Sequence, residues 1–339
     1  MPFTSPSPGQ RNIVRWNTSI YSVGLLGAKL EIPVHALAFL LVTQPDMGDA
    51  VASQMLYKDK RTYPRIYGLG NKPLGLWLRA RLALQKFNTK VWYHTLSLLA
   101  QDDVTFLNYG YATTDSGGAT LQLEAVDEAN RYPIQLYNRV ASAVDLGGKD
   151  VLEVGSGRGG GAAFIKKYLH LRSMIGVDFC GKAVRFCRRR HCQEKLSFIQ
   201  GDAENLPFPA EFFDAVLNLE SCHCYTSVAR FLAQAARVLR RGGHLLFADV
   251  GPKPYIDTLR EHIARCGLSI EEEEDITPAV MQALGITSEQ NRKKIQEQVP
   301  VGLRSIFRNF AAIRDTPVFE ACGAGEWVYI RFVLKKAAS

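Results

Sequence analysis

The sequence has no uninterrupted apolar run long enough to cross a bilayer. Its most apolar stretch, residues 23–42, is interrupted by Lys29, Glu31, Pro33 and His35, whereas a spanning helix needs about 20 mostly apolar residues. The first residues also lack the basic start and apolar centre of a secretory signal. Seven cysteines, an odd number in 339 residues, do not indicate a disulfide scaffold. These absences predict a cytoplasmic protein that does not span a membrane.

An excess of positive charge is confined to the first part of the chain. The net charge is +8, and residues 1–100 hold 12 basic and 4 acidic side chains, which is the whole excess. Aromatic residues are interleaved with these cations between residues 57 and 93. We predict a basic, aromatic-rich helical extension over residues 1–100 that packs over the main domain or contacts an anionic membrane surface through residues 20–95. No nucleic-acid recognition motif accompanies the cations, so no nucleic-acid partner is expected.

From about residue 145, short apolar runs alternate with amphipathic stretches, which is typical of repeated βα units and a doubly wound parallel sheet. The predicted strands are 150–155, 173–178, 196–201, 213–219, 243–249, 268–273 and 327–334. The predicted helices are 161–171, 182–190, 227–240 and 255–266. Residues 101–145 and 277–325 do not follow the alternation. We expect residues 146–339 to form the core, with 101–145 as a cap segment and 277–325 as a helical cap insertion.

A glycine-rich turn follows the first of these strands. Gly155, Gly157 and Gly160 match the pattern G-x-G-x-x-G, and glycine there lets a ligand approach the backbone without a Cβ in the way. Asp178 ends the next strand about twenty residues later, where a carboxylate can accept the hydroxyls of a ribose. Nicotinamide, flavin and S-adenosylmethionine binders all use such turns, so this pattern alone leaves the cofactor open.

The stretch from Gly201 to Val216, GDAENLPFPAEFFDAV, discriminates among these classes. With the E-x-G-x-G pattern at Glu153, Gly155 and Gly157, it resembles the class I S-adenosylmethionine-dependent methyltransferases over roughly residues 108–335. One departure is Arg241, which stands where the family usually has proline in a turn. The resemblance implies an α/β, Rossmann-like, doubly wound sheet of seven strands with an antiparallel last strand.

The same resemblance implies S-adenosyl-L-methionine as the cofactor and assigns residues to it. Gly155 and Gly157 would border its methionine half, Asp178 would hold the ribose, and Asp202 with Ala203 would contact the adenine. Glu153 is a further expected cofactor-binding residue.

Asn108-Tyr109-Gly110-Tyr111 is similar to a segment of the branch that methylates terpenoid, sterol and polyketide-lipid substrates. The pattern is nearest to the phthiotriolone/phenolphthiotriolone dimycocerosate O-methyltransferase type. The resemblance implies that Tyr109 and Tyr111 close over the methionine end of the cofactor and shape the entrance for the acceptor. The alternative is that both are ordinary half-buried tyrosines.

Methyl transfer to a hydroxyl requires a group that removes the hydroxyl proton. His223 follows the fourth strand of the core and Asp249 ends the fifth, and both lie at the carboxyl edge where open α/β sheets bind ligands. These strands are neighbours in the expected fold, so we expect His223 to be the general base and Asp249 to orient it. A second reading is that His223 only hydrogen-bonds the cofactor or the cap segment. Glu220 is the competing catalytic residue, because sterol-type relatives use an acid there to steady a carbocation.

We therefore predict a methyltransferase that modifies a hydroxyl of an apolar small molecule such as a polyketide, terpenoid or phenolic lipid. The alternatives are C-methylation of a sterol or prenyl substrate, a protein that binds cofactor at a membrane surface without turnover, and methylation of RNA or protein. The last is disfavoured by the neutral balance of residues 101–339. No metal site is expected, since Cys222 and Cys224 bracket the candidate base and no second cysteine pair has ligand spacing. The oligomeric state is left open.

Overall fold

The computed structural model describes residues 20–25, 28–33, 96, 102–112 and 121–338. Contacts divide the chain into two units, Met1–Thr43 and Gln44–Ser339. The described part of the first unit is an antiparallel pair, β1 (Ile20–Leu25) and β2 (Ala28–Pro33). The prediction of a helical extension is wrong at these residues, which form strands. Polar and apolar residues alternate from Ala28 to Ile32 in β2, which is a strand period, not a helical one. Of the rest of the predicted extension only Leu96, which is helical and buried, is among the described residues.

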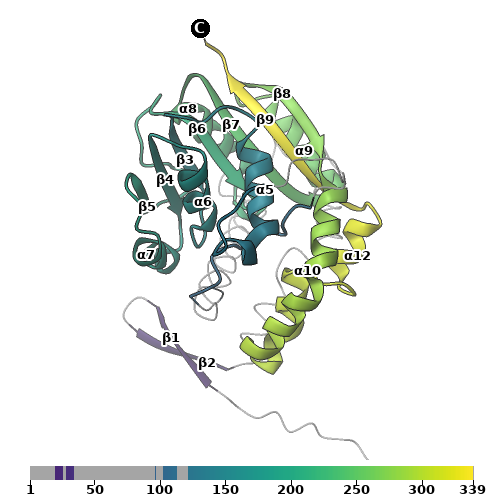
Figure 1. Ribbon diagram of the computed structural model, residues 1–339. Coiled ribbons are helices and arrows are strands. Elements are labelled where there is room, and N and C mark those ends of the chain that lie inside the picture. Colours follow the sequence, from purple (N-terminus) through teal and green to yellow (C-terminus); the bar gives the residue numbers. More distant parts are fainter. Residues whose placement is uncertain (1–19, 26–27, 34–95, 97–101, 113–120, 339) are drawn as a thin grey trace, which may run out of the picture. The chain divides into compact units, whose positions relative to one another are not determined.

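The second unit is built on a seven-stranded sheet (Figure 1). Its strands, in spatial order, are β5 (Leu196–Gln200), β4 (Ser173–Asp178), β3 (Asp150–Val154), β6 (Phe213–Leu219), β7 (Leu239–Pro252), β9 (Trp327–Lys336) and β8 (Leu268–Asp275). The first five are parallel, and β9 is antiparallel to both β7 and β8. The predicted Rossmann-like sheet with an antiparallel last strand is confirmed. Its order reverses between β3 and β6, where such sheets bind ligands.

Helices cover both faces of this sheet. On one face lie α5 (Arg131–Ala141), α6 (Gly160–Tyr168) and α7 (Gly181–Arg190); on the other lie α8 (Val228–Val238) and α9 (Lys253–Ile263). α8 starts at Ser227, whose hydroxyl accepts a hydrogen bond from the amide of Arg230. It ends before the predicted residue 240 because Leu239 already pairs with Phe213 of β6.

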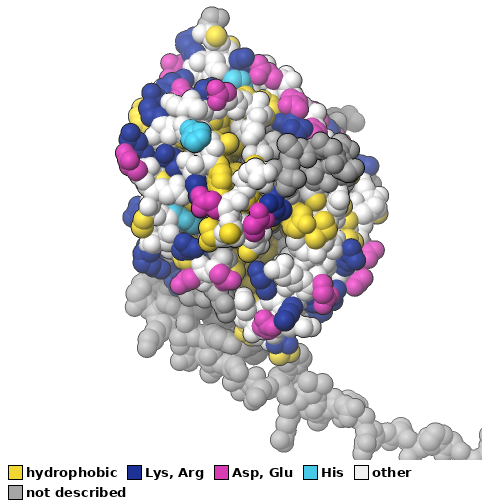
Figure 2. Space-filling view, viewed as in Figure 1, with side chains coloured by type: hydrophobic (Ala, Val, Ile, Leu, Met, Phe, Trp, Pro, Cys, Tyr) yellow, Lys and Arg dark blue, Asp and Glu magenta, His cyan; other side chains and the backbone are white. Residues whose placement is uncertain are grey.

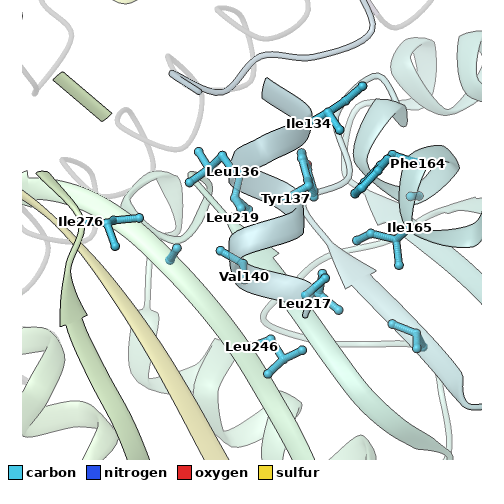
Figure 3. Close-up of a cluster of buried hydrophobic side chains, with 14 of the residues drawn as sticks. Ile134, Leu136, Tyr137, Val140, Phe164, Ile165, Leu217, Leu219, Leu246 and Ile276 are labelled. Carbon is cyan, nitrogen blue, oxygen red and sulfur yellow. The ribbon is translucent and has the colours of Figure 1, made fainter. Parts of the chain in front are cut away.

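α5 falls within the predicted cap segment but packs as part of the core. Figure 3 shows Leu136 of this helix beside Leu219 of β6, and Val140 near Leu217 of β6 and Leu246 of β7. All five side chains are buried. Because the apolar residues of α5 recur on one face, the helix covers the centre of the sheet, while residues 102–112 of the same segment contact the glycine-rich turn.

The insertion between β8 and β9 is helical, as predicted. It comprises α10 (Thr277–Gln298), η3 (Val301–Leu303), α11 (Arg304–Phe310) and α12 (Pro317–Gly323). α10 leaves the sheet where β8 ends, and α12 lies beside it (Figure 1). The start of the insertion is tied to Tyr329 of β9, whose carbonyl accepts from the Ile276 amide at 2.9 Å and whose amide donates to Thr277 Oγ1 at 2.8 Å.

On the face shown in Figure 2, Lys and Arg side chains are mixed with Asp and Glu. Within the part of the chain that the structure describes, no helix is both long and apolar enough to span a membrane.

Candidate active site

The glycine-rich turn joins β3 to α6 through left-handed backbone conformations. Gly155, Gly157 and Gly159 have φ values of 77°, 52° and 77°, which side chains with a Cβ rarely adopt. The amide of Gly157 donates to Asp178 Oδ2 at 2.9 Å, and the amide of Cys180 donates to Asp178 Oδ1 at 2.8 Å. Asp178 therefore ties the turn to the end of β4. Burial raises the pKa of this carboxyl to about 6, although both amides favour its charge.

The cap segment lies directly on this turn. The amide of Gly160 donates to the carbonyl of Thr105 at 3.1 Å. A Cβ on Gly160 would approach that carbonyl to 2.7 Å and the ring of Phe106 to 2.9 Å. Residues 102–112 can therefore lie against the start of α6 only because position 160 has no side chain.

A cavity of about 340 Å³ opens at the carboxyl ends of β3, β4 and β5. Among the predicted cofactor residues, Gly155, Asp178, Asp202 and Ala203 line it. Ser221, Cys224, Tyr225 and Thr226 line it from the segment after β6. Glu153, Gly157, Tyr109 and Tyr111 are described residues that do not form its lining. The structure thus brings the predicted ribose and adenine residues together around one cavity.

Glu153 lies beneath the turn instead of in the cavity. It is 1% exposed, and its Oε1 accepts a hydrogen bond from the hydroxyl of Tyr137 at 2.7 Å. Its Oε2 is buried and makes no hydrogen bond of ordinary geometry to the described residues, although the nearby amide of Ala162 favours the charged form of the carboxyl group. Burial raises the pKa of Glu153 to about 8. Gly161 makes this arrangement possible, because a Cβ there would meet the Tyr137 ring at 2.0 Å.

His223 and Asp249 are in direct contact, as the predicted strand order requires. Nδ1 of His223 lies 2.6 Å from Oδ1 of Asp249, and the His223 amide donates to Oδ2 at 2.9 Å. β6 and β7 are neighbours, with Leu219 opposite Ala248, so the residues that follow them meet. The His223 side chain is 26% exposed, whereas Asp249 is fully buried.

The electrostatics of this pair stabilise the imidazolium form. Burial alone lowers the pKa of His223, but the charge of Asp249 and the neighbouring Cys224 outweigh it and hold the pKa well above its ordinary value. Burial likewise raises the pKa of Asp249, yet His223 and the surrounding donors bring it below the usual range. With Nδ1 engaged by Asp249, Nε2 is the other ring nitrogen through which a proton can be exchanged with a ligand, and the Cys224 side chain is hydrogen-bonded to the same imidazole.

Glu220, the competing acid, makes two hydrogen bonds through one oxygen. Its Oε1 accepts from the amide of Tyr109 at 2.9 Å and from the hydroxyl of Tyr329 at 2.8 Å. Its backbone has a φ of 46°, uncommon for a residue with a side chain. Burial raises the pKa of Glu220 to about 7. The cap segment is therefore held to the end of β6 by this side chain.

Tyr109 and Tyr111 are half-buried and pack against the core cluster that contains α5. The amide of Tyr111 donates to the carbonyl of Tyr132 at 3.0 Å. Their contacts fit a cap segment fixed between Glu220 and α5.

The sequence did not indicate Tyr137, Tyr255 or Tyr329 as part of this region. Each donates its hydroxyl to a buried carboxylate: Glu153, Asp249 and Glu220 respectively. A buried acid that needs a donor is a signal for such partners. Which tyrosine supplies the donor depends on tertiary packing.

The region suits an adenosine-containing ligand with a charged amino-acid tail. A cavity of this size, with the Asp178 carboxylate on its wall, has the dimensions and polarity of a small-molecule site. Beside the turn, Ser156 Oγ and Glu153 Oε2 are buried polar atoms without a hydrogen bond of ordinary geometry to the part of the chain that the structure describes.

Comparison with known proteins identifies the family. The profile of the family described as "Methyltransferase domain" matches residues 152–247. The phthiotriol/phenolphthiotriol dimycocerosates methyltransferase of Mycobacterium tuberculosis (strain ATCC 25177 / H37Ra) is 38% identical over 248 residues, which are 73% of this chain and 91% of that protein. The chain belongs to the S-adenosylmethionine-dependent methyltransferases.

Other methyltransferases are also similar. A fatty-acid O-methyltransferase of Mycolicibacterium smegmatis is 37% identical over 230 residues, covering 68% of this chain and 83% of that protein. The geranyl diphosphate C-methyltransferase of Streptomyces coelicolor A3(2), solved with S-adenosyl-L-homocysteine, has a TM-score of 0.55 at 14% identity and covers 75% of this chain and 98% of that one. This structural likeness confirms the fold. The cofactor of this methyltransferase is S-adenosyl-L-methionine.

Among residues 102–112 and 121–338, no group of three or more His, Cys, Asp and Glu side chains is arranged to hold a metal ion.

Proposed function

We propose that this methyltransferase transfers a methyl group to a hydroxyl of an apolar, lipid-like molecule, with His223 as the general base and Asp249 as its orienting partner. The observation that supports it is the 2.6 Å contact between the two side chains at the ends of neighbouring strands. Two residues of the same segment, Ser221 and Cys224, line the cavity. His223 is therefore close in the chain to residues that line the cavity proposed to hold the cofactor.

When bound, S-adenosyl-L-methionine would supply a methyl carbon activated by its sulfonium, which the acceptor oxygen attacks in line so that the thioether S-adenosyl-L-homocysteine leaves. The acceptor's O–H bond breaks, its proton passes to Nε2 of His223, and the new O–CH₃ bond forms as the S–CH₃ bond breaks. Asp249 stabilises the imidazolium produced and fixes the ring through Nδ1. A sulfonium cation near His223 would oppose its protonation before the reaction and so favour the basic form.

The acceptor is proposed to be a hydroxylated lipid because of the relatives' names and the chemistry of the pair. The names of two relatives refer to phthiotriol dimycocerosates and to fatty acids. A fatty acid carries no proton on its carboxylate at neutral pH, so its methylation needs no base. A hydroxyl does need one. The contact between His223 and Asp249 therefore favours a hydroxyl acceptor.

C-methylation through Glu220 is the second candidate, and the surroundings of Glu220 count against it. A carboxylate that steadies a carbocation must be charged, but burial raises the pKa of Glu220 to about 7. Its Oε1 is already engaged by Tyr109 and Tyr329. We propose that Glu220 holds the cap segment in place.

The remaining assignments complete the proposal. Gly155, Gly157 and Glu153 serve the methionine half of the cofactor, Asp178 its ribose, and Asp202 with Ala203 its adenine, while Tyr109 and Tyr111 border the acceptor entrance. The helical insertion 277–325 forms the acceptor wall. A cytoplasmic location and peripheral membrane contact through residues 20–95 are also proposed. Their support is the sequence, because most of residues 20–95 lie outside the described part of the chain.

Turnover of labelled S-adenosyl-L-methionine tests the reaction. We would offer an organic extract of the source cells, a long-chain aliphatic alcohol and a fatty acid, and identify labelled products by mass spectrometry. A labelled ether is expected with wild type, and His223→Ala should lose 10²- to 10⁴-fold in kcat, as is typical for removal of a general base.

Two variants discriminate the alternatives. His170→Asn, at an exposed histidine with a φ of 52° that asparagine tolerates, is the matched control and should keep wild-type turnover. A labelled hydrocarbon lost mainly in Glu220→Gln would replace the proposal with C-methylation. Cofactor binding without labelled product would favour the non-catalytic reading.

A further inference from the structure

Asp249 is surrounded by more donors than the pairing with His223 requires. Oδ1 accepts from the amide of Val250 at 3.0 Å in addition to contacting His223. Oδ2 accepts from the His223 amide at 2.9 Å, the hydroxyl of Tyr255 at 2.7 Å and the thiol of Cys222 at 3.0 Å. Two of these five donors are side-chain groups from outside the pair.

Tyr255 and Cys222 are also in contact with each other. The Tyr255 hydroxyl lies 3.0 Å from Cys222 Sγ, so the two groups form one cluster on Oδ2. Tyr255 comes from α9 and Cys222 from η2 (Cys222–Cys224), so the cluster joins two elements across the end of β7. Burial raises the pKa of both groups well above their usual values, and each therefore stays protonated and able to donate.

The backbone makes room for the Tyr255 ring. A Cβ on Gly251 would lie 2.6 Å from Cδ1 of Tyr255, so a side chain at position 251 would displace the ring and move its hydroxyl. Gly251 is in β7, two residues after Asp249. The same strand therefore contains both the Asp249 carboxylate and the glycine that leaves space for the Tyr255 ring, whose hydroxyl donates to that carboxylate.

We propose that Tyr255 is a positioning residue for methyl transfer, which with Cys222 holds Oδ2 of Asp249 so that Oδ1 faces the imidazole of His223. This inference rests on the base role proposed for His223. Tyr255 acts through Asp249. By donating a hydrogen bond to Oδ2, its hydroxyl weakens the electrostatic attraction between the carboxylate and the imidazolium. Removing that donor leaves Asp249 less stabilised, so the carboxylate attracts the imidazolium proton more strongly.

His223 should therefore be harder to deprotonate in Tyr255→Phe, and the midpoint of its titration should rise by about one pH unit. Other titratable groups also face the pair and would be retained in that variant: Glu220 at the end of β6, Cys222 and Cys224 on η2, and Tyr329 on β9.

The test is an NMR titration of histidine ring protons in the whole protein, without cofactor or acceptor, with His223 assigned from its absence in His223→Ala. Tyr255→Phe keeps the ring beside Gly251 and should raise the midpoint. Cys222→Ala should do the same, and Cys222→Ser, which keeps a donor, should restore the wild-type value. These two variants test the inference even if Tyr255→Phe does not fold.

Tyr168→Phe is the matched control. It removes another tyrosine hydroxyl from another carboxylate, Asp127 at 2.7 Å, away from the pair. The His223 midpoint should not change in this variant. The kcat–pH profile of Tyr255→Phe, measured with the acceptor found above, should shift upward with the NMR midpoint.

The outcomes separate the two proposals. If His223→Ala is inactive but Tyr255→Phe and Cys222→Ala keep the wild-type midpoint and pH profile, the positioning role is overturned and the base role stands. If His223→Ala keeps wild-type turnover, the base role fails, and a catalytic role for Tyr255 fails with it. An upward shift in both variants, absent in Tyr168→Phe, supports the inference.

Discussion

Replacing Glu153 with Gln tests whether the acid beneath the glycine-rich turn is neutral in the folded protein. Burial raises the pKa of Glu153 to about 8 from an ordinary value of 4.5. Because the folded-state pKa is the higher one, the folded chain binds more protons than the unfolded chain between these pH values. The stabilisation from this group is therefore complete below about pH 4.5 and is lost as the pH rises through about 8.

The size of this loss follows from the two pKa values. At 1.36 kcal/mol per pKa unit, the free energy of unfolding should fall by on the order of 5 kcal/mol between pH 4.5 and pH 8. Gln cannot ionise, and its oxygen can still accept the Tyr137 hydroxyl. The variant should therefore gain stability relative to wild type as the pH rises. Asp178 and Glu220, whose pKa values are also raised by burial, remain in both proteins and largely cancel in the difference.

Urea unfolding of the cofactor-free protein at a series of pH values from 5 to 8.5 measures this difference. Glu194→Gln is the control, because that side chain is 88% exposed and its difference from wild type should be flat with pH. If the free energies of unfolding of Glu153→Gln and wild type change by the same amount from pH 5 to 8.5, Glu153 is charged in the folded protein and the reasoning is refuted.

Three further predictions follow from the site. Gly161→Ala should destabilise the protein by on the order of 3 kcal/mol, because its Cβ would overlap the buried Tyr137 ring; an unchanged thermal transition would contradict this. Asp178→Asn should weaken cofactor binding by about 10- to 100-fold in calorimetry, since a charged acceptor is lost, and equal Kd values would exclude Asp178 as a ligand. The kcat of wild type should rise with pH above neutrality as His223 loses its proton. Asp249→Asn should lower both that midpoint and kcat, and a midpoint that stays in place would show that Asp249 does not set it.

Much of the fold was predictable because the sheet has a strong local signal. Each core strand is a short apolar run bounded by turn residues, and all seven occur within a few residues of the predicted bounds. The largest difference is β7, which starts at Leu239 instead of residue 243. Pairing with Phe213 extends it, and pairing is a tertiary effect that local sequence does not report.

The candidate site likewise contains contacts that the sequence could predict and contacts that it could not. The contact between His223 and Asp249 was predictable because it depends only on strand order and on which residues end each strand. The donors to the buried acids were not predictable, because Tyr255 and Tyr329 come from a helix and an antiparallel strand whose angles and registers depend on the whole core. The β1–β2 pair was overlooked although its alternation is visible in the sequence.

The two hydrogen bonds that tie Ile276 and Thr277 to Tyr329 have a consequence for how such proteins diversify. They close the helical insertion at its base, so β8 and β9 keep their register whatever lies between them. Since the entropy cost of closing a loop grows only slowly with its length, this segment can be lengthened, shortened or exchanged at little expense to the sheet. If the insertion forms the acceptor wall, as proposed, selectivity for the molecule being methylated can change during evolution, or by grafting in the laboratory, while the parallel half of the sheet is inherited intact.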